Sequence, residues 1–423
     1  MSLAAPLPST AAFGPAPADA LRARLSHAIV LSFVAAQVFA GVLRWALGLV
    51  HLQALIYLPA LLAWADIALV AIATVRARTL SRTTLWLGCL LVVGALTGLL
   101  ALPPQQVAFG AWVLTPLIYG YALADRWPLT GAGYRRAALA LLALACVGIV
   151  GNAYIAYPWI GANFELGGKE IAGARDWSIG ERQRLAGFAR SSFDAAGQIA
   201  ILAALYNVGE PRRWLRGAIW LLAATAVTLS TARGILLAMA VAAIAIEAEH
   251  LGRRGVARTL LALGFAWMTL PPLLAWTVDF SQQARLQLHS SHGSYLDRLA
   301  NMWPQARDLW LDAPVPWLGR GLGGIGAAQT LFEPARFNAA DNLLVYQCVA
   351  LGALALPLLA GAAIGLWRIG ASARADAATL VAFALIVVWY GAVSNIVEHP
   401  ILAAAYGLLL QRGASLLRAR RLS

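Results

Sequence analysis

The sequence predicts an all-α polytopic membrane protein with about 12 transmembrane helices, on the basis of three observations. Of the 423 residues, 61% are hydrophobic and only 12% are charged, whereas an ordinary soluble domain carries roughly 25% charged residues. The chain contains a series of apolar stretches close to the ~20 residues that a helix needs to cross a bilayer. Arginines fall between alternate stretches, as they do in the cytoplasmic loops of membrane proteins.

Each apolar stretch predicts one transmembrane helix. The stretches lie at 27–49, 51–75, 84–101, 105–124, 137–157, 193–209, 214–231, 234–249, 257–278, 342–366, 377–397 and 399–413. Some are short or polar, so counts of about eleven and thirteen stay open. With the N-terminus inside, the arginine-rich connections face the cytoplasm, and so does the C-terminus.

This topology divides the chain into five parts. They are a disordered cytoplasmic tail at 1–26, helices 1–9 at 27–278 with a small outer loop at 158–192, a large outer loop at 279–341, helices 10–12 at 342–413, and a basic cytoplasmic tail at 414–423. Because the inner loops hold most of the arginines behind the net charge of +13, we expect membrane lipids as partners and no nucleic acid.

Some cationic residues are predicted to lie on the outer side of the membrane, although Lys and Arg usually gather in cytoplasmic loops. These residues give the first indication of function. They cluster in the two outer loops and in the turn at 231–233. A guanidinium group presents a planar fork of donors that matches phosphate oxygens. The alternative is that these side chains reach lipid headgroups or pair with nearby acids. The candidate phosphate-binding residues are Arg184, Arg190, Arg233, Arg298 and Arg320.

The large outer loop contains two patterned segments. From 294 to 312, apolar residues recur at helical spacing, which predicts an amphipathic helix on the outer membrane surface. The stretch WLGRGLGGIG follows at 317–326. Its glycines allow tight turns and let backbone N–H groups approach a ligand closely.

Three aspartates could contribute a functional carboxylate. Asp341 and Asn342 open the helix after the large loop, and Asp194 opens the helix at 193–209. An aspartate there is either a helix cap or, if the arginines hold a substrate nearby, a general base. Asp66 lies within an apolar stretch, where an acid is a functional candidate or part of a buried polar contact.

The sequence contains no motif for metal or cofactor chemistry. His289 and His292 lie in the large loop and His399 precedes Pro400, without the spacing of metal ligands. A phosphate-binding loop, a nucleophile elbow and a dinucleotide fingerprint are also absent from the sequence. We therefore expect no metal, no cofactor and a substrate that is activated beforehand.

Three motifs, in this order, resemble a known family. They are RLAGFARSSFD at 184–194, STARG at 230–234, and a pattern that runs from Arg298 and Trp303 through PWLGRGLG at 316–323 to ADNLLVY at 340–346. With one large, late outer loop, they resemble the O-antigen ligase and O-antigen polymerase superfamily of bacterial envelope enzymes. The resemblance covers 184–365 in detail.

The resemblance implies a C-type glycosyltransferase-like fold in the bacterial inner membrane, with the outer loops and the active site in the periplasm. It implies a glycan on undecaprenyl diphosphate as donor, a sugar hydroxyl as acceptor, and inversion at the anomeric carbon. Fixed arginines would replace a metal at the leaving diphosphate. The implied catalytic residues are Arg190, Arg233 and Asp341, and the implied substrate-binding residues are Arg184, Arg298, Arg320, Asn342 and Asp194.

One departure bears on the reaction. The ligase branch has a histidine where this chain has Asp341, and Asp-Asn at this point resembles the polymerase branch. The sequence therefore favours polymerisation of O-antigen or exopolysaccharide repeat units, together with other polysaccharide-assembly proteins. One alternative is a ligase that transfers the glycan to lipid A–core. A more distant one is a flippase for lipid-linked oligosaccharide, which the clustering of cations at one face disfavours.

Overall fold

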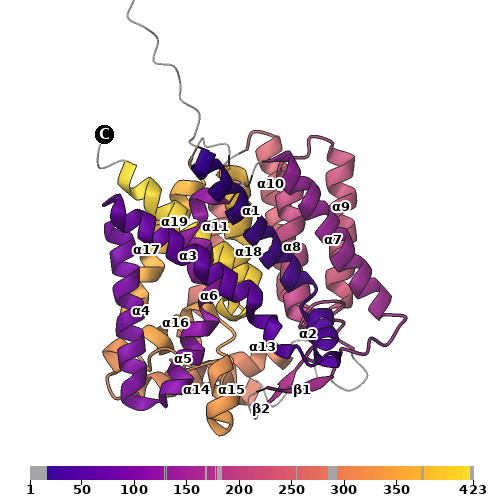
Figure 1. Ribbon diagram of the computed structural model, residues 1–423. Coiled ribbons are helices and arrows are strands. Elements are labelled where there is room, and N and C mark those ends of the chain that lie inside the picture. Colours follow the sequence, from indigo (N-terminus) through magenta and orange to yellow (C-terminus); the bar gives the residue numbers. More distant parts are fainter. Residues whose placement is uncertain are drawn as a thin grey trace, which may run out of the picture.

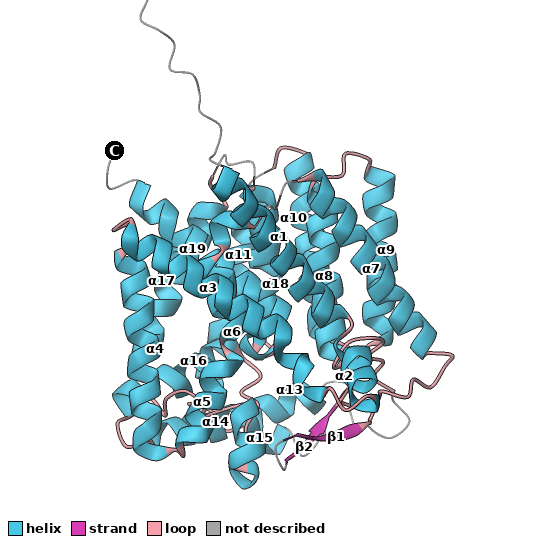
Figure 2. Cartoon of the chain, in the orientation of Figure 1, coloured by secondary structure: helices cyan, strands magenta, loops and turns pink. Residues whose placement is uncertain are grey.

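The computed structural model describes residues 17–127, 129, 131–166, 169–176, 178, 183–253, 255–283, 293–372 and 376–419. This part of the chain is mainly helical, with an antiparallel hairpin of β1 (Asn163–Leu166) and β2 (Lys169–Ala172) (Figures 1 and 2). The α-helices are α1 (Pro17–Val38), α2 (Ala40–Leu49), α3 (Leu58–Arg76), α4 (Arg82–Ala101), α5 (Pro104–Val113), α6 (Thr115–Ala122), α7 (Ala132–Asn152), α8 (Ser192–Val208), α9 (Arg213–Leu229), α10 (Arg233–His250), α11 (Gly255–Ala275), α13 (Gly293–Asp297), α14 (Trp303–Leu311), α15 (Ala327–Phe332), α16 (Leu343–Leu351), α17 (Ala355–Ile369), α18 (Ala377–Gly391) and α19 (Pro400–Ala419).

Every apolar stretch of the sequence contains helix, as predicted. Among the described residues, α1 and α2, bent by 82°, would make one candidate span if they cross the membrane together. Five other segments are long and apolar enough to cross a membrane, namely Gln53–Arg76, Arg82–Ala101, Ala132–Asn152, Gly255–Ala275 and Leu343–Ile369. The chain is therefore helical with several membrane-spanning candidates, and the count of twelve stays a prediction.

The predicted disordered tail at the N-terminus is too long. The tail at 1–26 was expected to be disordered, but α1 already begins at Pro17. At the other terminus, α19 continues to Ala419, inside the predicted tail at 414–423. Proline suits a first helical position because the N–H it lacks would have no partner there. The rest of both tails lies outside the described residues.

Three predicted spans each contain two α-helices, and in the one at 342–366 the 3₁₀ turn Gly352–Leu354 lies between α16 and α17. The stretch at 27–49 bends at Phe39 between α1 and α2. The stretch at 105–124 breaks at Leu114, where Pro116 follows in the first turn of α6. A proline inside one continuous helix would remove a backbone hydrogen bond and clash with the preceding turn, so the chain starts a new helix instead.

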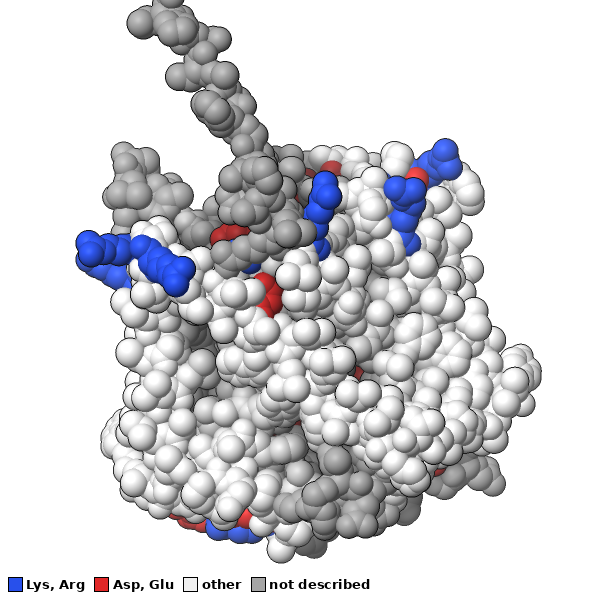
Figure 3. Space-filling model, viewed as in Figure 1, with Lys and Arg blue, Asp and Glu red and all other residues white. Residues whose placement is uncertain are grey.

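Charged side chains gather at two opposite ends of the molecule. In Figure 3 they lie along the upper and lower edges, and the surface between is almost wholly uncharged on this face. In Figure 1, α1 begins and α19 ends at the upper edge, which we call the terminal end. The lower edge carries β1, β2, α14 and α15, and we call it the loop end. An uncharged belt between charged ends suits a bilayer.

The turn between α18 and α19 lies inside the molecule. The 15 residues of α18 span about 22 Å at ~1.5 Å per residue, which is less than the ~30 Å hydrocarbon thickness. Ser394 and Asn395 in this turn are only 6% and 4% exposed. A polar turn is therefore held below the surface of the loop end.

The loop that precedes α8 is fixed closely against α2. The Gly41 N–H donates to the Phe188 carbonyl oxygen at 2.9 Å, and a Cβ on Gly41 would lie 2.6 Å from the Ala189 carbonyl oxygen. On the other side, the Trp159 indole N–H donates to the Gly187 carbonyl oxygen at 2.8 Å. Side chains on α2 and on this loop are therefore held side by side.

The predicted amphipathic helix at 294–312 exists, but its apolar face packs on protein and not on the membrane surface. It consists of α13, a π-helical turn at Arg298–Met302 and α14. Trp303 is fully buried, and its indole N–H donates to the Ala340 carbonyl oxygen at 2.9 Å. The segment therefore covers the start of α16.

Backbone N–H groups of the glycine-rich stretch at 317–326 also bind other segments of the chain. The Arg320 N–H donates to the Val349 carbonyl oxygen at 2.6 Å, and the Leu322 N–H donates to that of Gly94 at 2.9 Å. Gly321 has a φ of +81°, and a Cβ there would overlap the backbone of α4. The expectation that these N–H groups approach a ligand is wrong, because they approach α4 and α16.

We predict that Gly41→Ala destabilises the protein and that Gly48→Ala does not. The first change places a methyl group against a carbonyl oxygen, and overpacking costs about 1–3 kcal/mol. Gly48 lies on the same helix with nothing within 4 Å of an added Cβ, so alanine there improves helix propensity. Thermal unfolding of the purified variants in detergent measures both effects. Equal melting temperatures would contradict the close contact between α2 and the loop.

Candidate functional site

Three arginines from separate segments gather at the loop end. Arg44 comes from α2, Arg190 from the loop before α8, and Arg175 follows β2 and donates its N–H to the Arg190 carbonyl oxygen at 2.7 Å. The Nη1 atom of Arg44 and the Nε atom of Arg190 are buried and have no hydrogen-bond partner among the described residues. Such buried donors are rare in proteins. We call Arg44, Arg175 and Arg190 the arginine cluster.

Burial and neighbouring like charges disfavour the charge of Arg190. Burial and the charges of Arg44 and Arg175 lower the pKa of Arg190 to about 9, although Asp194 and Glu398 oppose the shift. Arg190 therefore stays protonated at neutral pH. Like charges held together in this way are typical of a site that awaits an anion, since a multiply charged anion both neutralises them and accepts their hydrogen bonds.

Asp194 is not the cap of its helix, and it connects Arg190 to a histidine. The cap of α8 is Ser191, whose hydroxyl accepts the Asp194 N–H at 3.1 Å and donates to Oδ2 at 2.8 Å. The other oxygen, Oδ1, lies 2.8 Å from Nδ1 of His399. Nε2 of His399 lies 3.2 Å from the Ser394 hydroxyl oxygen. Sequence position alone did not indicate this pairing of α8 with the turn before α19.

Glu398 is the second carboxylate near the arginines. Its Oε1 accepts the Ala327 N–H at 2.6 Å, at the start of α15. Burial raises the pKa of Glu398, and the Ala327 hydrogen bond and the charges of His399, Arg175 and Arg190 only partly oppose this. A raised pKa weakens the compensation that Glu398 gives to the arginine cluster.

Asp341 pairs with Arg298 and caps no helix. Its Oδ2 accepts a hydrogen bond from Arg298 Nη2 at 2.6 Å. Ala340 and Asp341 have φ values of +63° and +43°, a region that costs non-glycine residues about 1–2 kcal/mol each. The neighbouring Asn342 is the cap, since its Oδ1 accepts the Val345 N–H. A strained turn therefore directs the Asp341 carboxylate toward Arg298.

The Asp194–His399 pair and the Asp341–Arg298 pair both lie near Tyr390. The Tyr390 ring lies 5.9 Å from the His399 ring between centroids, and the phenol lies within the electrostatic influence of Asp341, Asp194 and Arg298. Residues from α8 and α18, from the π-helical turn after α13, from the turn before α16 and from the turn before α19 thus meet at one place. Arg298 also has a buried Nε without a hydrogen-bond partner among the described residues.

Arg233 and Arg184 lie near this region with different exposure. Arg233 begins α10 with an exposed side chain. The adjacent Gly234 packs against Tyr390, whose Cδ2 would lie 3.2 Å from an added Cβ. Arg184 is half-buried, and its guanidinium carbon lies 5.5 Å from the centroid of the Phe193 ring. Arg233 stays a catalytic candidate and Arg184 a substrate-binding candidate.

Arg320 and Asn342 have structural partners that occupy their donors. Arg320 is 5% exposed and donates to the Gly324 carbonyl oxygen at 2.7 Å and to Glu333 Oε1 at 2.6 Å. Asn342 is fully buried and donates to the carbonyl oxygens of Met268 and Ala392, each at 2.9 Å. Their expected substrate contacts find no support in this geometry.

Asp66 forms a buried polar contact away from these groups. It accepts a hydrogen bond from the Ser26 hydroxyl at 2.9 Å and lies 3.7 Å from Arg126 Nη1. This corresponds to the structural alternative considered for an acid inside an apolar stretch. His289 and His292 lie outside the described residues. In the described part of the chain, no three His, Cys, Asp or Glu side chains form a group that could hold a metal, and metal independence stays a prediction.

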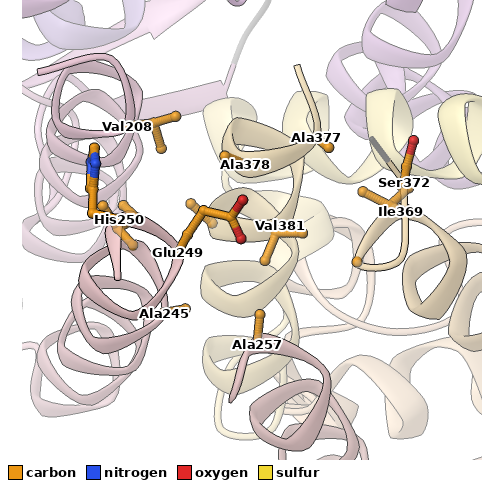
Figure 4. Close-up of a pocket in the computed structure, with 13 residues that line it drawn as sticks. Val208, Ala245, Glu249, His250, Ala257, Ile369, Ser372, Ala377, Ala378 and Val381 are labelled. Atoms are coloured by element: carbon orange, nitrogen blue, oxygen red, sulfur yellow. The ribbon is translucent and has the colours of Figure 1, made fainter. Parts of the chain in front are cut away.

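A separate hollow lies at the terminal end, between the ends of α8, α10 and α17 and the starts of α11 and α18. Its lining is mainly aliphatic. Glu249 extends across it toward Ala378 and Val381, and His250 lies near Val208 (Figure 4). The 18 residues of α10, about 27 Å long, separate this hollow from the loop end, so it is not part of the candidate site.

Comparison with protein-family models and with curated protein sequences finds no match for this chain. The functional argument therefore depends on the residues themselves.

We predict that Arg320→Ala strongly reduces stability, whereas Arg336→Ala does not. Removing one partner of a buried ion pair costs about 3–5 kcal/mol, because the other charge is left unpaired. Burial opposes ionisation of Glu333, but hydrogen bonds from Gln106 and Arg320 lower the pKa of this carboxyl overall. Arg336 makes a 3.8 Å pair with Asp312 and its side chain is 53% exposed, so its loss has little effect.

Thermal unfolding in detergent compares the two arginine variants. If Arg320→Ala unfolds like the unchanged protein but binds lipid diphosphates more weakly, Arg320 binds substrate and its structural assignment is wrong.

Proposed function

We propose that the protein is a periplasm-facing, metal-independent glycosyltransferase that uses a glycan on undecaprenyl diphosphate as donor and a sugar hydroxyl as acceptor. The observation that carries this proposal is the arginine cluster, in which the buried Arg44 Nη1 and Arg190 Nε atoms have no hydrogen-bond partner among the described residues. A diphosphate supplies oxygens for these donors and negative charge for the cluster. Fixed positive charge also stabilises a diphosphate as it leaves, which is the electrostatic task of such a catalyst.

The position of the cluster suits a lipid-linked substrate. The helix α2, which carries Arg44, lies toward the loop end in Figure 1, and the loop that carries Arg190 is hydrogen-bonded to it. The uncharged belt of Figure 3 adjoins this end. A polyprenyl chain in the bilayer would bring its diphosphate to this depth. The loop end lies opposite the terminal end, where α1 begins and α19 ends (Figure 1). If the termini are cytoplasmic, as the arginine distribution indicates, the cluster faces the periplasm.

Within this class we favour polymerisation of O-antigen or exopolysaccharide repeat units over ligation to lipid A–core. The Asp341-Asn342 pair supports this preference, since it resembles the polymerase branch. Gathering of the candidate-site arginines Arg44, Arg175 and Arg190 at the loop end supports an enzyme over a flippase, which would need polar groups along a path through the membrane.

Reconstitution tests the proposal directly. The purified protein in proteoliposomes, with an undecaprenyl-diphosphate oligosaccharide and EDTA, should lengthen the glycan without lipid A–core. Product that forms only when lipid A–core is added would identify a ligase. The absence of product in both reactions, with folded protein and the donor of its own strain, would contradict glycosyl transfer.

We predict that Arg190→Met and Arg44→Met each reduce kcat/KM by about 100-fold or more without loss of thermal stability. Removal of one member of a like-charged, buried cluster relieves repulsion in the folded state, so the two effects separate. Arg253→Met, at an exposed position of the terminal end, is the matched control and keeps full activity. Full activity in both cluster variants would contradict the assignment of the diphosphate site.

A further inference from the structure

Glycosyl transfer needs a group that receives the proton of the acceptor hydroxyl. Asp341, the candidate from the sequence, is held by Arg298 at 2.6 Å, and taking up a proton would break that ion pair. His399 has the opposite arrangement. Its Nδ1 faces Asp194 at 2.8 Å, and its Nε2 lies 3.2 Å from the hydroxyl oxygen of Ser394.

We infer that His399 is the general base of the reaction and that Asp194 positions it. This inference rests on the proposed function. The Asp194 carboxylate accepts a hydrogen bond from Nδ1–H, which fixes the tautomer with a free lone pair on Nε2. The same carboxylate stabilises the imidazolium that forms once Nε2 takes a proton, as in other Asp–His pairs.

The backbone holds the His399 ring in place. The His399 N–H donates to the Ile396 carbonyl oxygen at 3.2 Å, and its own carbonyl accepts the Ala403 N–H at 2.8 Å. Pro400 follows and restricts His399 to extended backbone, observed at φ −100° and ψ 103°. The His399 side chain is 18% exposed, so the ring is held in place but is not fully shielded from solvent.

Asp194 also connects the base to the diphosphate site, because Arg190 lies within its electrostatic influence. In the step that follows from this geometry, the acceptor oxygen bonds to the anomeric carbon. The bond from that carbon to the diphosphate breaks, and its electron pair leaves with the diphosphate oxygen next to the arginine cluster. The acceptor proton goes to Nε2 of His399, and the imidazolium later returns it to water.

The hydrogen-bond order Ser394–His399–Asp194 is also that of a serine nucleophile site. Ser394 is only 6% exposed, whereas a nucleophile must reach the substrate. Ser394 is better placed as the group whose hydroxyl occupies Nε2 until the acceptor hydroxyl arrives.

The test measures kcat, donor affinity and the pH–rate profile of His399→Asn, Asp194→Asn and Ser394→Ala in proteoliposomes. Asparagine keeps a donor toward Asp194 but has no lone pair at the position of Nε2. We expect His399→Asn to lower kcat by about 100-fold or more, to leave the affinity for undecaprenyl-diphosphate oligosaccharide within about 3-fold, and to remove the acidic limb of the profile. His250→Asn, exposed at the terminal end, is the matched control.

The other variants separate positioning from structure. Asp194→Asn should lower kcat and shift the acidic limb of the pH–rate profile, because the Asp194 carboxylate contacts the imidazole directly. Glu398, Tyr390 and Arg190 also lie near the imidazole and stay unchanged in this variant. Ser394→Ala should keep at least a third of kcat, whereas a loss as large as that of His399→Asn would indicate a serine nucleophile and overturn the inference.

The outcomes distinguish this inference from the proposed function. Active unchanged protein together with a His399→Asn variant of equal kcat overturns the base and leaves the glycosyltransferase intact. Loss of donor affinity in His399→Asn, with the pH profile unchanged, likewise overturns the base, because it shows a role in donor binding. Unchanged protein without any product overturns the proposed function, and the base with it.

Discussion

Holding Arg44, Arg175 and Arg190 together is the constraint on which the arrangement of the loop end depends. Burial and mutual repulsion both disfavour three guanidinium groups at one place, and Asp194 and Glu398 offset this only in part. Packing elsewhere must therefore fix the three segments. The 82° bend between α1 and α2, and the contact of Gly41 with the loop before α8, bring Arg44 to Arg190.

The short helices α16 and α18 place further residues of the candidate site below the surface of the loop end. Because α18 stops before it could cross a bilayer, the turn that carries Ser394, Glu398 and His399 lies beneath the loop end. Asp194 then contacts this turn from α8. Strain at Ala340 and Asp341 persists because Trp303 and Arg298 hold that turn, and such strain is common at functional sites. Under the proposed function, the Asp194 carboxylate lies between Arg190, which stabilises the leaving diphosphate, and His399, which takes the proton of the acceptor.

Much of the fold could be predicted from the sequence, because hydrophobic length and arginine placement are local signals. They located helix in all twelve apolar stretches. The breaks at Phe39 and Leu114 could not be predicted in the same way, since the apolar pattern continues across both. The glycines at 317–326 suggested a ligand, but backbone packing against α4 and α16 requires them equally.

The site was only partly predictable. Arg190 and Asp194 stood out because they lie in one polar segment. Arg44 lies inside an apolar stretch and Arg175 in the small outer loop, and neither is a candidate from the sequence because their partners lie far away along the chain. The pairing of His399 with Asp194 joins residues 205 positions apart, and no local pattern encodes it. An intramembrane arginine and a histidine before a proline were the signals available.

The most direct test of the account is a cryo-EM structure of the protein with undecaprenyl diphosphate bound. The account predicts phosphate oxygens within about 3.2 Å of Arg190 Nε and Arg44 Nη1, with the polyprenyl chain along the uncharged belt. Phosphates bound instead at Arg233 or Arg320, with Arg44 and Arg190 unchanged and unoccupied, would contradict it.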